Sequence, residues 1–311
     1  MDLSGVFPPV ATPFAGDDVD LQALRRNVER YLTTPLRGIV VLGSNGEAPA
    51  VDDEEARHIV AAARERVPSG RLLIAGTGRE STGAAIRAAT AAARAGADAV
   101  LVRPPGFFKT QLTAAVLIDH YRRVADASPV PVLLYNFAAA FGVDLGLEVV
   151  APLAAHPNVA GLKESGGDIS RVGDVVSRTP DGFTVLVGSA PTFYGSLCMG
   201  ADGGILALAC VVPDACVRLR ELTLAGRHRD ALALQRALTP LARAVTTRFG
   251  VPGLKAALAL AGYDSGAPRL PLSPASPDAV AEIERHLATA HAGLEASLAL
   301  VGGPTTSLTI P

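Results

Sequence analysis

Short apolar segments recur along the chain and alternate with segments of helical periodicity. They are near-continuous runs of Val, Ile and Leu with no polar alternation, which is typical of parallel strands buried on both faces. Such strands need crossover helices between them, and the polar-apolar periodicity of the intervening segments predicts those helices. The eight apolar segments begin at Gly5, Gly38, Arg71, Ala97, Pro131, Val159, Phe183 and Gly203.

Capping residues mark the ends of several predicted helices. The segment 51–68 opens with Asp and Glu, which favour the positive end of the helix dipole, and it should stop at Pro68. In two further helices, Ser81 or Thr82 is the expected N-cap with Gly96 as terminator, and Asp168 is the expected N-cap with Pro180 as stop.

Eight strands alternating with helices predict a (β/α)8 (TIM) barrel in residues 1–212. A doubly wound parallel sheet is the competing fold, but no GxGxxG follows the first strand. From residue 213 the pattern is helical only, so residues 213–298 are predicted to form a C-terminal helical extension. Residues 299–311 show no packing pattern, and we expect this tail to be mobile.

Composition narrows the class of protein. The 311 residues are 49% hydrophobic and 19% charged, enough for a large core, and the net charge of −2 gives no basic surface for nucleic acid or an anionic membrane. No signal-peptide pattern and no apolar run of membrane-spanning length is present, so we expect a cytoplasmic protein. The odd number of cysteines without metal-ligand spacing predicts buried, reduced thiols at Cys198, Cys210 and Cys216.

Lysine is scarce in this chain, with only three residues among 28 basic side chains. One of them, Lys163, lies in "VAGLKES" at the end of the sixth apolar run. Arg keeps its proton, whereas a desolvated Lys can lose one and attack a carbonyl to form a Schiff base. The competing interpretation is a lysine that snorkels to solvent or pairs with Glu164.

Several residues with suitable chemistry follow predicted strands at the end that faces the active site in barrels of this type. A tyrosine hydroxyl can donate and accept the protons that imine chemistry moves, and a "GSNG" turn offers N–H groups to a carboxylate. The competing interpretations are a Tyr135 that only caps the core, an ordinary tight turn, and an Asn136 that only shapes its loop. The strand-end residues are Ser44, Asn45, Tyr135, Lys163, Ser165, Gly188 and Ile205.

The arrangement "GSNGE…YN…GLKES" resembles the class I pyruvate aldolases of the dihydrodipicolinate synthase and N-acetylneuraminate lyase family, over residues 5–275. The resemblance implies a covalent Schiff base on Lys163 without metal or organic cofactor, pyruvate and an aldehyde as partners, and a homotetramer built from two dimers. It further implies that Tyr135 shuttles protons, that Ser44 relays them and binds the keto-acid carboxylate with Asn45, and that Gly188 and Ile205 line the pyruvyl pocket through their backbones. Ser165, just beyond the lysine, is a further candidate for binding the substrate.

Within the family, "GSNGE", "SGGDISR" and "TTRFGVPGLKAALALAGY" look most like 4-hydroxy-2-oxoglutarate aldolase. The arginine that the synthase uses for its semialdehyde would fall near Ala140, which disfavours that activity. The chain departs from the family at Phe107 and Phe108, where a Tyr pair is usual, and at Ala138, where Pro is usual. The adjacent phenylalanines suit a buried subunit interface.

The sequence therefore predicts a lyase that cleaves or forms a 4-hydroxy-2-oxo acid through a Lys163 imine. Two alternatives stay open. A dehydratase or hydratase-aldolase would use the same imine on a related 2-oxo acid, and a non-catalytic member would bind a keto acid as a sensor.

Overall fold

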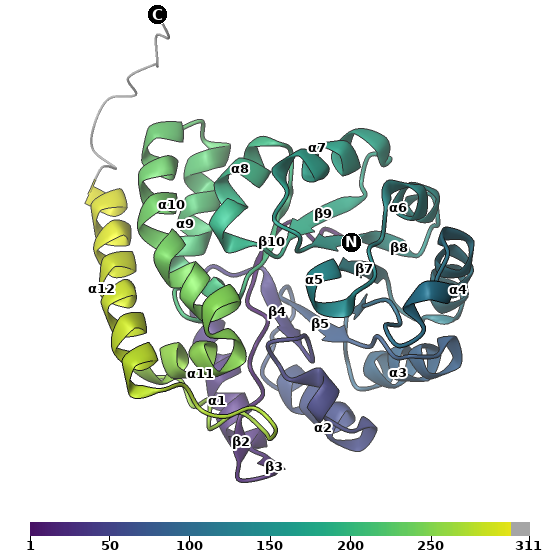
Figure 1. Cartoon of the computed structure of the whole chain (residues 1–311), viewed down its shortest axis with the longest axis horizontal. Helices are drawn as coiled ribbons and strands as arrows, with labels where there is room; N and C mark the ends of the chain where they lie inside the picture. Colours follow the sequence, from purple (N-terminus) through teal and green to yellow (C-terminus); the bar gives the residue numbers. More distant parts are fainter. Residues whose placement is uncertain (300–311) are drawn as a thin grey trace, which may run out of the picture.

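Eight parallel strands form the centre of the computed structural model, which describes residues 1–299 (Figure 1). The strands pair in the order β1-β10-β9-β8-β7-β6-β5-β4. Each predicted apolar run contains one of them, so the barrel prediction is confirmed. Their bounds are β1 Gly5–Phe7, β4 Gly38–Val41, β5 Leu72–Gly76, β6 Ala99–Val102, β7 Val132–Asn136, β8 Val159–Glu164, β9 Thr184–Val187 and β10 Gly203–Ile205.

The barrel closes between β1 and β4 through a few hydrogen bonds rather than a continuous ladder. Pro8 and Pro9 follow β1, and proline has no N–H to donate. The Val40 N–H donates to the Pro8 carbonyl at 3.0 Å, and the Val10 N–H donates to the Val40 carbonyl at 2.8 Å. These hydrogen bonds join β1 to β4 and close the barrel, which excludes the open sheet of the doubly wound alternative.

Helices cover the outside of the barrel (Figure 1). Asp52 and Glu55 form a capping box at the start of α2, which ends at Arg64 rather than reaching Pro68. Ser81 rather than Thr82 caps α3, and Asp168 caps α7. The helices up to the eighth strand are α1 Leu21–Tyr31, α2 Asp53–Arg64, α3 Thr82–Arg94, α4 Ala114–Ala127, α5 Ala138–Phe141, α6 Leu147–Ala154, α7 Ile169–Arg178 and α8 Phe193–Cys198.

Four helices follow the eighth strand: α9 Pro213–Leu224, α10 His228–Arg243, α11 Gly250–Leu260 and α12 Pro277–Ala299. Helix α9 packs against β1 and α8, while α12 lies along α10 and α11 at the outer edge (Figure 1). A division of the chain at residue 213 stays a prediction. The tail was expected from residue 299, but Ala299 is the last residue of α12, and residues 300–311 lie outside the described part of the chain.

The core has two layers. One lies between strands and helices, and the other fills the barrel with side chains such as Phe7, Leu133 and Ile205. Of the three free thiols, Cys210 and Cys216 are buried, and burial raises their pKa values. The expectation of a buried thiol is wrong for Cys198, the last residue of the short helix α8, which is exposed. Within residues 1–299, no helix has both the length and the apolar character needed to cross a membrane.

Candidate active site

Strands β7 and β8 place a phenol and an amine side by side inside the barrel. Tyr135 lies opposite Lys163 in the parallel register. Because side chains alternate along a strand, Leu134 and Leu162 pack in the outer layer while Tyr135 and Lys163 face inward. Lys163 is buried, and its Nζ lies 4.0 Å from the centroid of the Tyr135 ring.

Glu164 faces the other side of β8 and does not pair with Lys163. Its carboxylate accepts from Arg171 Nε at 2.8 Å, from Asn136 Nδ2 at 2.9 Å and from the Gly166 N–H at 2.7 Å. The interpretation of Lys163 as an ion-pair partner of Glu164 is therefore wrong. Asn136 also accepts from the Leu145 N–H at 2.9 Å, so it does shape the loop after β7.

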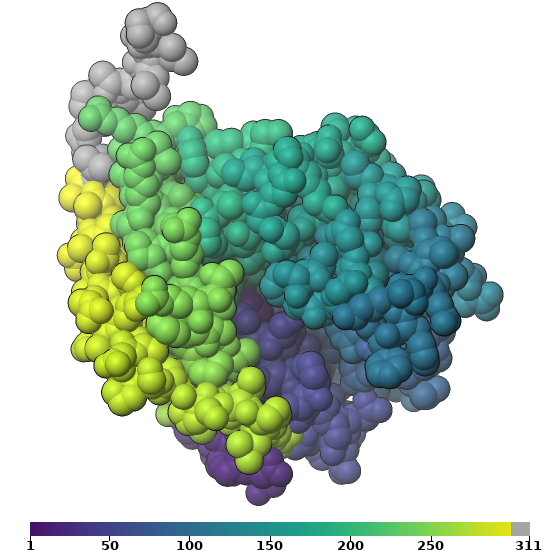
Figure 2. Space-filling model, in the orientation of Figure 1, coloured from purple at the N-terminus to yellow at the C-terminus, as the bar shows by residue number. Residues whose placement is uncertain are grey.

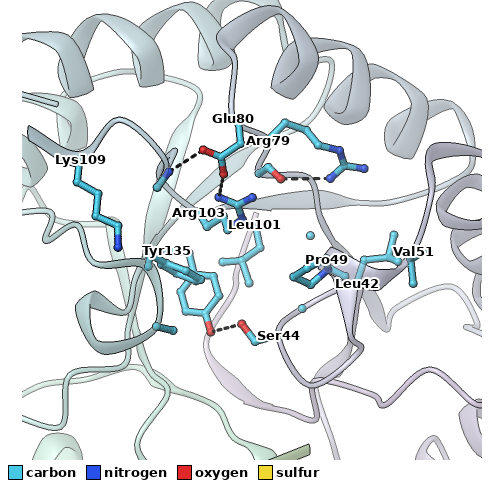
Figure 3. Close-up of a pocket in the computed structure, with 17 residues that line it drawn as sticks. Leu42, Ser44, Pro49, Val51, Arg79, Glu80, Leu101, Arg103, Lys109 and Tyr135 are labelled. Atoms are coloured by element: carbon cyan, nitrogen blue, oxygen red, sulfur yellow. Dashed lines mark hydrogen bonds and ion pairs between the residues drawn. The ribbon is translucent and has the colours of Figure 1, made fainter. Parts of the chain in front are cut away.

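The Tyr135 hydroxyl lies 3.3 Å from Ser44 Oγ (Figure 3). Burial would raise the pKa of this phenol, but the positive charge of Lys163 and the hydrogen bond with Ser44 outweigh burial. The pKa of Tyr135 is therefore lowered. A phenol in this state can accept a proton and return it close to the amine.

Gly188 and Ser165 complete the surroundings of Lys163. A Cβ on Gly188 would lie 1.9 Å from Ser165 Oγ and 3.2 Å from Lys163 Cε, so only glycine fits there. Ser165 Oγ is buried, and its interaction with Tyr135 also helps to lower the pKa of that phenol. Ile205 shares the interior cluster with Tyr135. Asn45 is half-buried, and within residues 1–299 its side chain makes no hydrogen bond to these groups.

The turn that carries Ser44 is held in a strained conformation. Leu42 and Glu47 flank it with φ of 57° and 54°, in the left-handed region that non-glycine residues avoid. The Glu47 carboxylate binds Lys255 Nζ at 2.7 Å and the Arg269 N–H at 2.9 Å. This buried pair ties the turn to α11 and the loop beyond it, so the turn is more than an ordinary tight turn.

A cavity of about 630 Å³ opens at this end of the barrel. Figure 2 shows this face hollowed between the purple-blue segments after β4 and the teal segments after β7. Ser44 and Tyr135 line the cavity, while Lys163 contacts the Tyr135 ring without being part of the lining. The upper wall adds four charged side chains that the sequence analysis did not assign to the site (Figure 3): Arg79, Glu80, Arg103 and Lys109.

Phe107 and Phe108 do not line the cavity; they are 79% and 64% exposed. Lys109, directly after them, does line it. The scarcity of lysine was the sequence signal that could have indicated Lys109 and Lys255 as well as Lys163, because Lys109 lines the cavity and Lys255 pairs with Glu47. No comparable signal distinguishes Arg79, Glu80 or Arg103 from surface charges.

A buried lysine beside a phenol at the mouth of a parallel barrel defines the Schiff-base lyase class of (β/α)8 enzymes. The model of the dihydrodipicolinate synthetase family matches residues 2–290. The chain belongs to this family, whose members are Schiff-base lyases of the class I pyruvate aldolase type, and it is an enzyme of that type.

Two relatives with different activities match the chain equally well. A 4-hydroxy-tetrahydrodipicolinate synthase of Exiguobacterium sp. is 36% identical over 281 residues, covering 90% of this chain and 95% of the relative. A probable mitochondrial 4-hydroxy-2-oxoglutarate aldolase of Emericella nidulans is 36% identical over 299 residues, covering 91% and 96%. The solved 4-hydroxy-tetrahydrodipicolinate synthase of Methylacidiphilum fumariolicum SolV superposes with a TM-score of 0.90 at 30% identity, covering 96% of this chain and 99% of that one.

Proposed function

We propose that the protein is an aldolase that cleaves or forms a 4-hydroxy-2-oxo acid, of the 4-hydroxy-2-oxoglutarate type, to or from pyruvate and an aldehyde. The observation that carries the proposal is the buried Lys163 Nζ, 4.0 Å from the centre of the Tyr135 ring, with Ser44 on the hydroxyl of that phenol. The proposal is supported by Ala140, which gives the cavity a methyl group where the resemblance places the synthase's arginine.

The chemistry follows from the nucleophile and its neighbours. Lys163 Nζ attacks the C2 carbonyl, and loss of water gives a protonated imine. The Tyr135 phenolate removes the proton of the C4 hydroxyl. The electrons of the C3–C4 bond then move to the iminium nitrogen, which leaves an aldehyde and an enamine. Protonation of the enamine at C3 and hydrolysis of the imine release pyruvate and free the lysine.

The remaining site residues bind the substrate in this proposal. Ser44 passes the proton to and from Tyr135 and, with Asn45, holds the keto-acid carboxylate. Ser165 lies next to the imine, and its buried hydroxyl can donate to the pyruvyl group. Gly188 and Ile205 shape the pyruvyl pocket, the first by leaving room for Lys163 and Ser165.

We further infer a homotetramer built from two dimers and a cytoplasmic location. The two exposed phenylalanines of the loop after β6 support self-association. Three unpaired thiols support a reducing compartment.

Borohydride reduction in the presence of pyruvate tests the proposal. Intact mass should increase by one reduced pyruvyl unit, and peptide mapping should place it on Lys163. Lys163→Arg keeps the charge and should be neither labelled nor active. Turnover of 4-hydroxy-2-oxoglutarate to pyruvate and glyoxylate distinguishes the aldolase from a dehydratase, which would leave an unsaturated or dioxo acid. Labelling at Lys109 or Lys255 would contradict the mechanism, and labelling without turnover of any 2-oxo acid would indicate a sensor.

A further inference from the structure

Three cations line the cavity, and two of them already have carboxylate partners. Arg79 pairs with Asp53 at 2.8 Å, and Arg103 pairs with Glu80 at 2.8 Å. Lys109 has neither an ion pair nor a side-chain hydrogen bond to any residue in the range 1–299. Among the described residues, Lys109 is therefore the cavity cation whose charge is not already balanced by a protein carboxylate.

The backbone around Lys109 is held in place. Glu80 Oε2 accepts from the N–H groups of Gly106 at 2.9 Å and Phe107 at 3.0 Å, which fixes the start of the loop. Lys109 opens the short helical turn η2 Lys109–Gln111 that follows. The loop thus presents Lys109 at a defined position, although the side chain itself is exposed and has room to move.

The side chain of Lys109 runs along the wall toward Tyr135 (Figure 3). It lies against Gly142, where φ is 69° and an added Cβ would be 2.4 Å from Nζ. The preceding residue, Phe141, contacts the Tyr135 ring edge-to-face with centroids 5.0 Å apart. The Lys109 ammonium therefore lies beside Gly142, and the neighbouring residue Phe141 contacts the ring of the proton-transferring Tyr135.

We propose that Lys109 forms a carboxylate subsite for the aldehyde partner, so that the enzyme selects aldehydes carrying a second, anionic group. This inference rests on the proposed function and assigns the residue that binds the second carboxylate of its substrate. The 4-hydroxy-2-oxo acid is then a dianion, with one carboxylate beside the imine and the other at Lys109. Lysine suits this task because its flexible stem and rotatable donors can meet carboxylates at different distances from the carbonyl.

Steady-state condensation with pyruvate tests this assignment. The readout is the ratio of kcat/KM for two anionic aldehydes, glyoxylate and succinic semialdehyde, to kcat/KM for the neutral acetaldehyde and propanal. Lys109→Met should lower the ratio about ten- to hundred-fold, as expected for the loss of one charge-assisted hydrogen bond, mainly through KM of the anionic aldehydes. Lys109→Arg, which keeps the charge, should retain most of the ratio. Arg285→Met is the matched control, because it removes one positive charge from an exposed position on α12.

The dependence of KM on ionic strength is a second measurement, beside the ratio of kcat/KM values. KM for the preferred anionic aldehyde should rise with ionic strength in the wild type and respond less in Lys109→Met. The assignment is overturned if the ratio is unchanged in Lys109→Met, if all four aldehydes lose rate equally, or if Arg285→Met lowers the ratio as much. A wild-type enzyme that forms no borohydride-trapped imine with pyruvate contradicts the proposed function itself, whereas a normal imine with an unchanged ratio contradicts only the role of Lys109.

Discussion

At the scale of single residues, Tyr135 is the group whose replacement tests the proton-transfer step most directly. Tyr135→Phe keeps the ring over Lys163 and removes the hydroxyl that contacts Ser44. We expect kcat for aldol cleavage to fall by about 10²-fold or more, the range for a positioned acid-base group. Stopped-flow or steady-state assays with 4-hydroxy-2-oxoglutarate measure this loss. A variant with wild-type kcat would show that another group carries the proton.

The lowered pKa of Tyr135 predicts the pH dependence of the Ser44 variant. Cleavage needs the phenolate, so kcat should rise with pH through the pKa of Tyr135. The hydrogen bond with Ser44 helps to lower that pKa, so Ser44→Ala should raise it and move the rising limb of kcat to higher pH. The positive charge of Lys163, which also lowers the pKa of Tyr135, persists in the iminium during cleavage. A limb that stays in place, or moves to lower pH, would exclude Tyr135 as the titrating group.

Single residues also show what the sequence could reveal about the site. The positions of Lys163 and Tyr135 were predictable because a rare lysine and a tyrosine each lie next to the last residue of an apolar strand, and the fold fixes which end is the mouth. Ser165, Gly188 and Ile205 also lie where the strand ends predicted. The partners of Glu47 were not predictable, because Lys255 and Arg269 reach it from the far end of the chain through packing that periodicity does not encode.

At the scale of elements, the Glu47–Lys255 pair joins the Ser44 turn to α11. Both side chains are only 2% exposed, and burial lowers the pKa of Lys255 despite the nearby carboxylate. Glu47→Gln or Lys255→Met leaves one buried charge without its partner, so each should lower the free energy of unfolding by about 3–5 kcal/mol. Urea denaturation measures this. The double variant should be more stable than the sum of the two losses predicts, and simple additivity would show that the pair does not act as a unit.

Helices α3 and α4 are joined by a buried histidine whose titration should affect stability. His120 Nδ1 lies 2.9 Å from Thr82 Oγ1, and burial lowers the pKa of the ring below its ordinary value of 6.5. The unfolded chain therefore takes up this proton at higher pH than the folded chain does. The stability that the neutral ring contributes is present above the unfolded pKa and is lost as the pH falls toward the lowered pKa.

His120→Asn keeps an atom in the position of Nδ1 and removes the titration. Between about pH 7.5 and pH 5, the wild type should lose more of its free energy of unfolding than His120→Asn does. Denaturant titrations at each pH measure the two slopes. Equal slopes would mean that other groups control this pH range.

The helices and strands show which parts of the fold the sequence pattern can predict. The eight strands were predictable because a buried parallel strand must be apolar on both faces, and the caps at Ser81 and Asp168 followed from short polar side chains. The antiparallel pair of β2 Phe14–Ala15 and β3 Asp18–Val19 was missed because two-residue strands have no period to detect. The end of α2 at Arg64 was also missed, because no glycine or proline marks the end of the helix before Pro68.

At the scale of the whole molecule, the loop after β6 places two large apolar side chains on the surface of the single chain. Phe107 and Phe108 pack edge-to-face with centroids 5.0 Å apart and are 79% and 64% exposed. Glu80 holds the backbone of this loop, so the pair is presented by an ordered segment. Burying such a pair against a second copy of the chain would stabilise an oligomer by roughly 25 cal/mol per Å² of apolar surface removed from water.

Replacing both phenylalanines should therefore weaken self-association. Phe107→Ser/Phe108→Ser should lower the molar mass measured by light scattering at micromolar concentration, while circular dichroism shows an intact fold. Leu224→Ser is the matched control, because it removes an apolar side chain that is 60% exposed at the end of α9 and should leave the mass unchanged. If the wild type is a monomer, the tetramer proposal is wrong. If the wild type is an oligomer but the double variant keeps its mass, the subunits associate through another face, and the two phenylalanines need a different explanation.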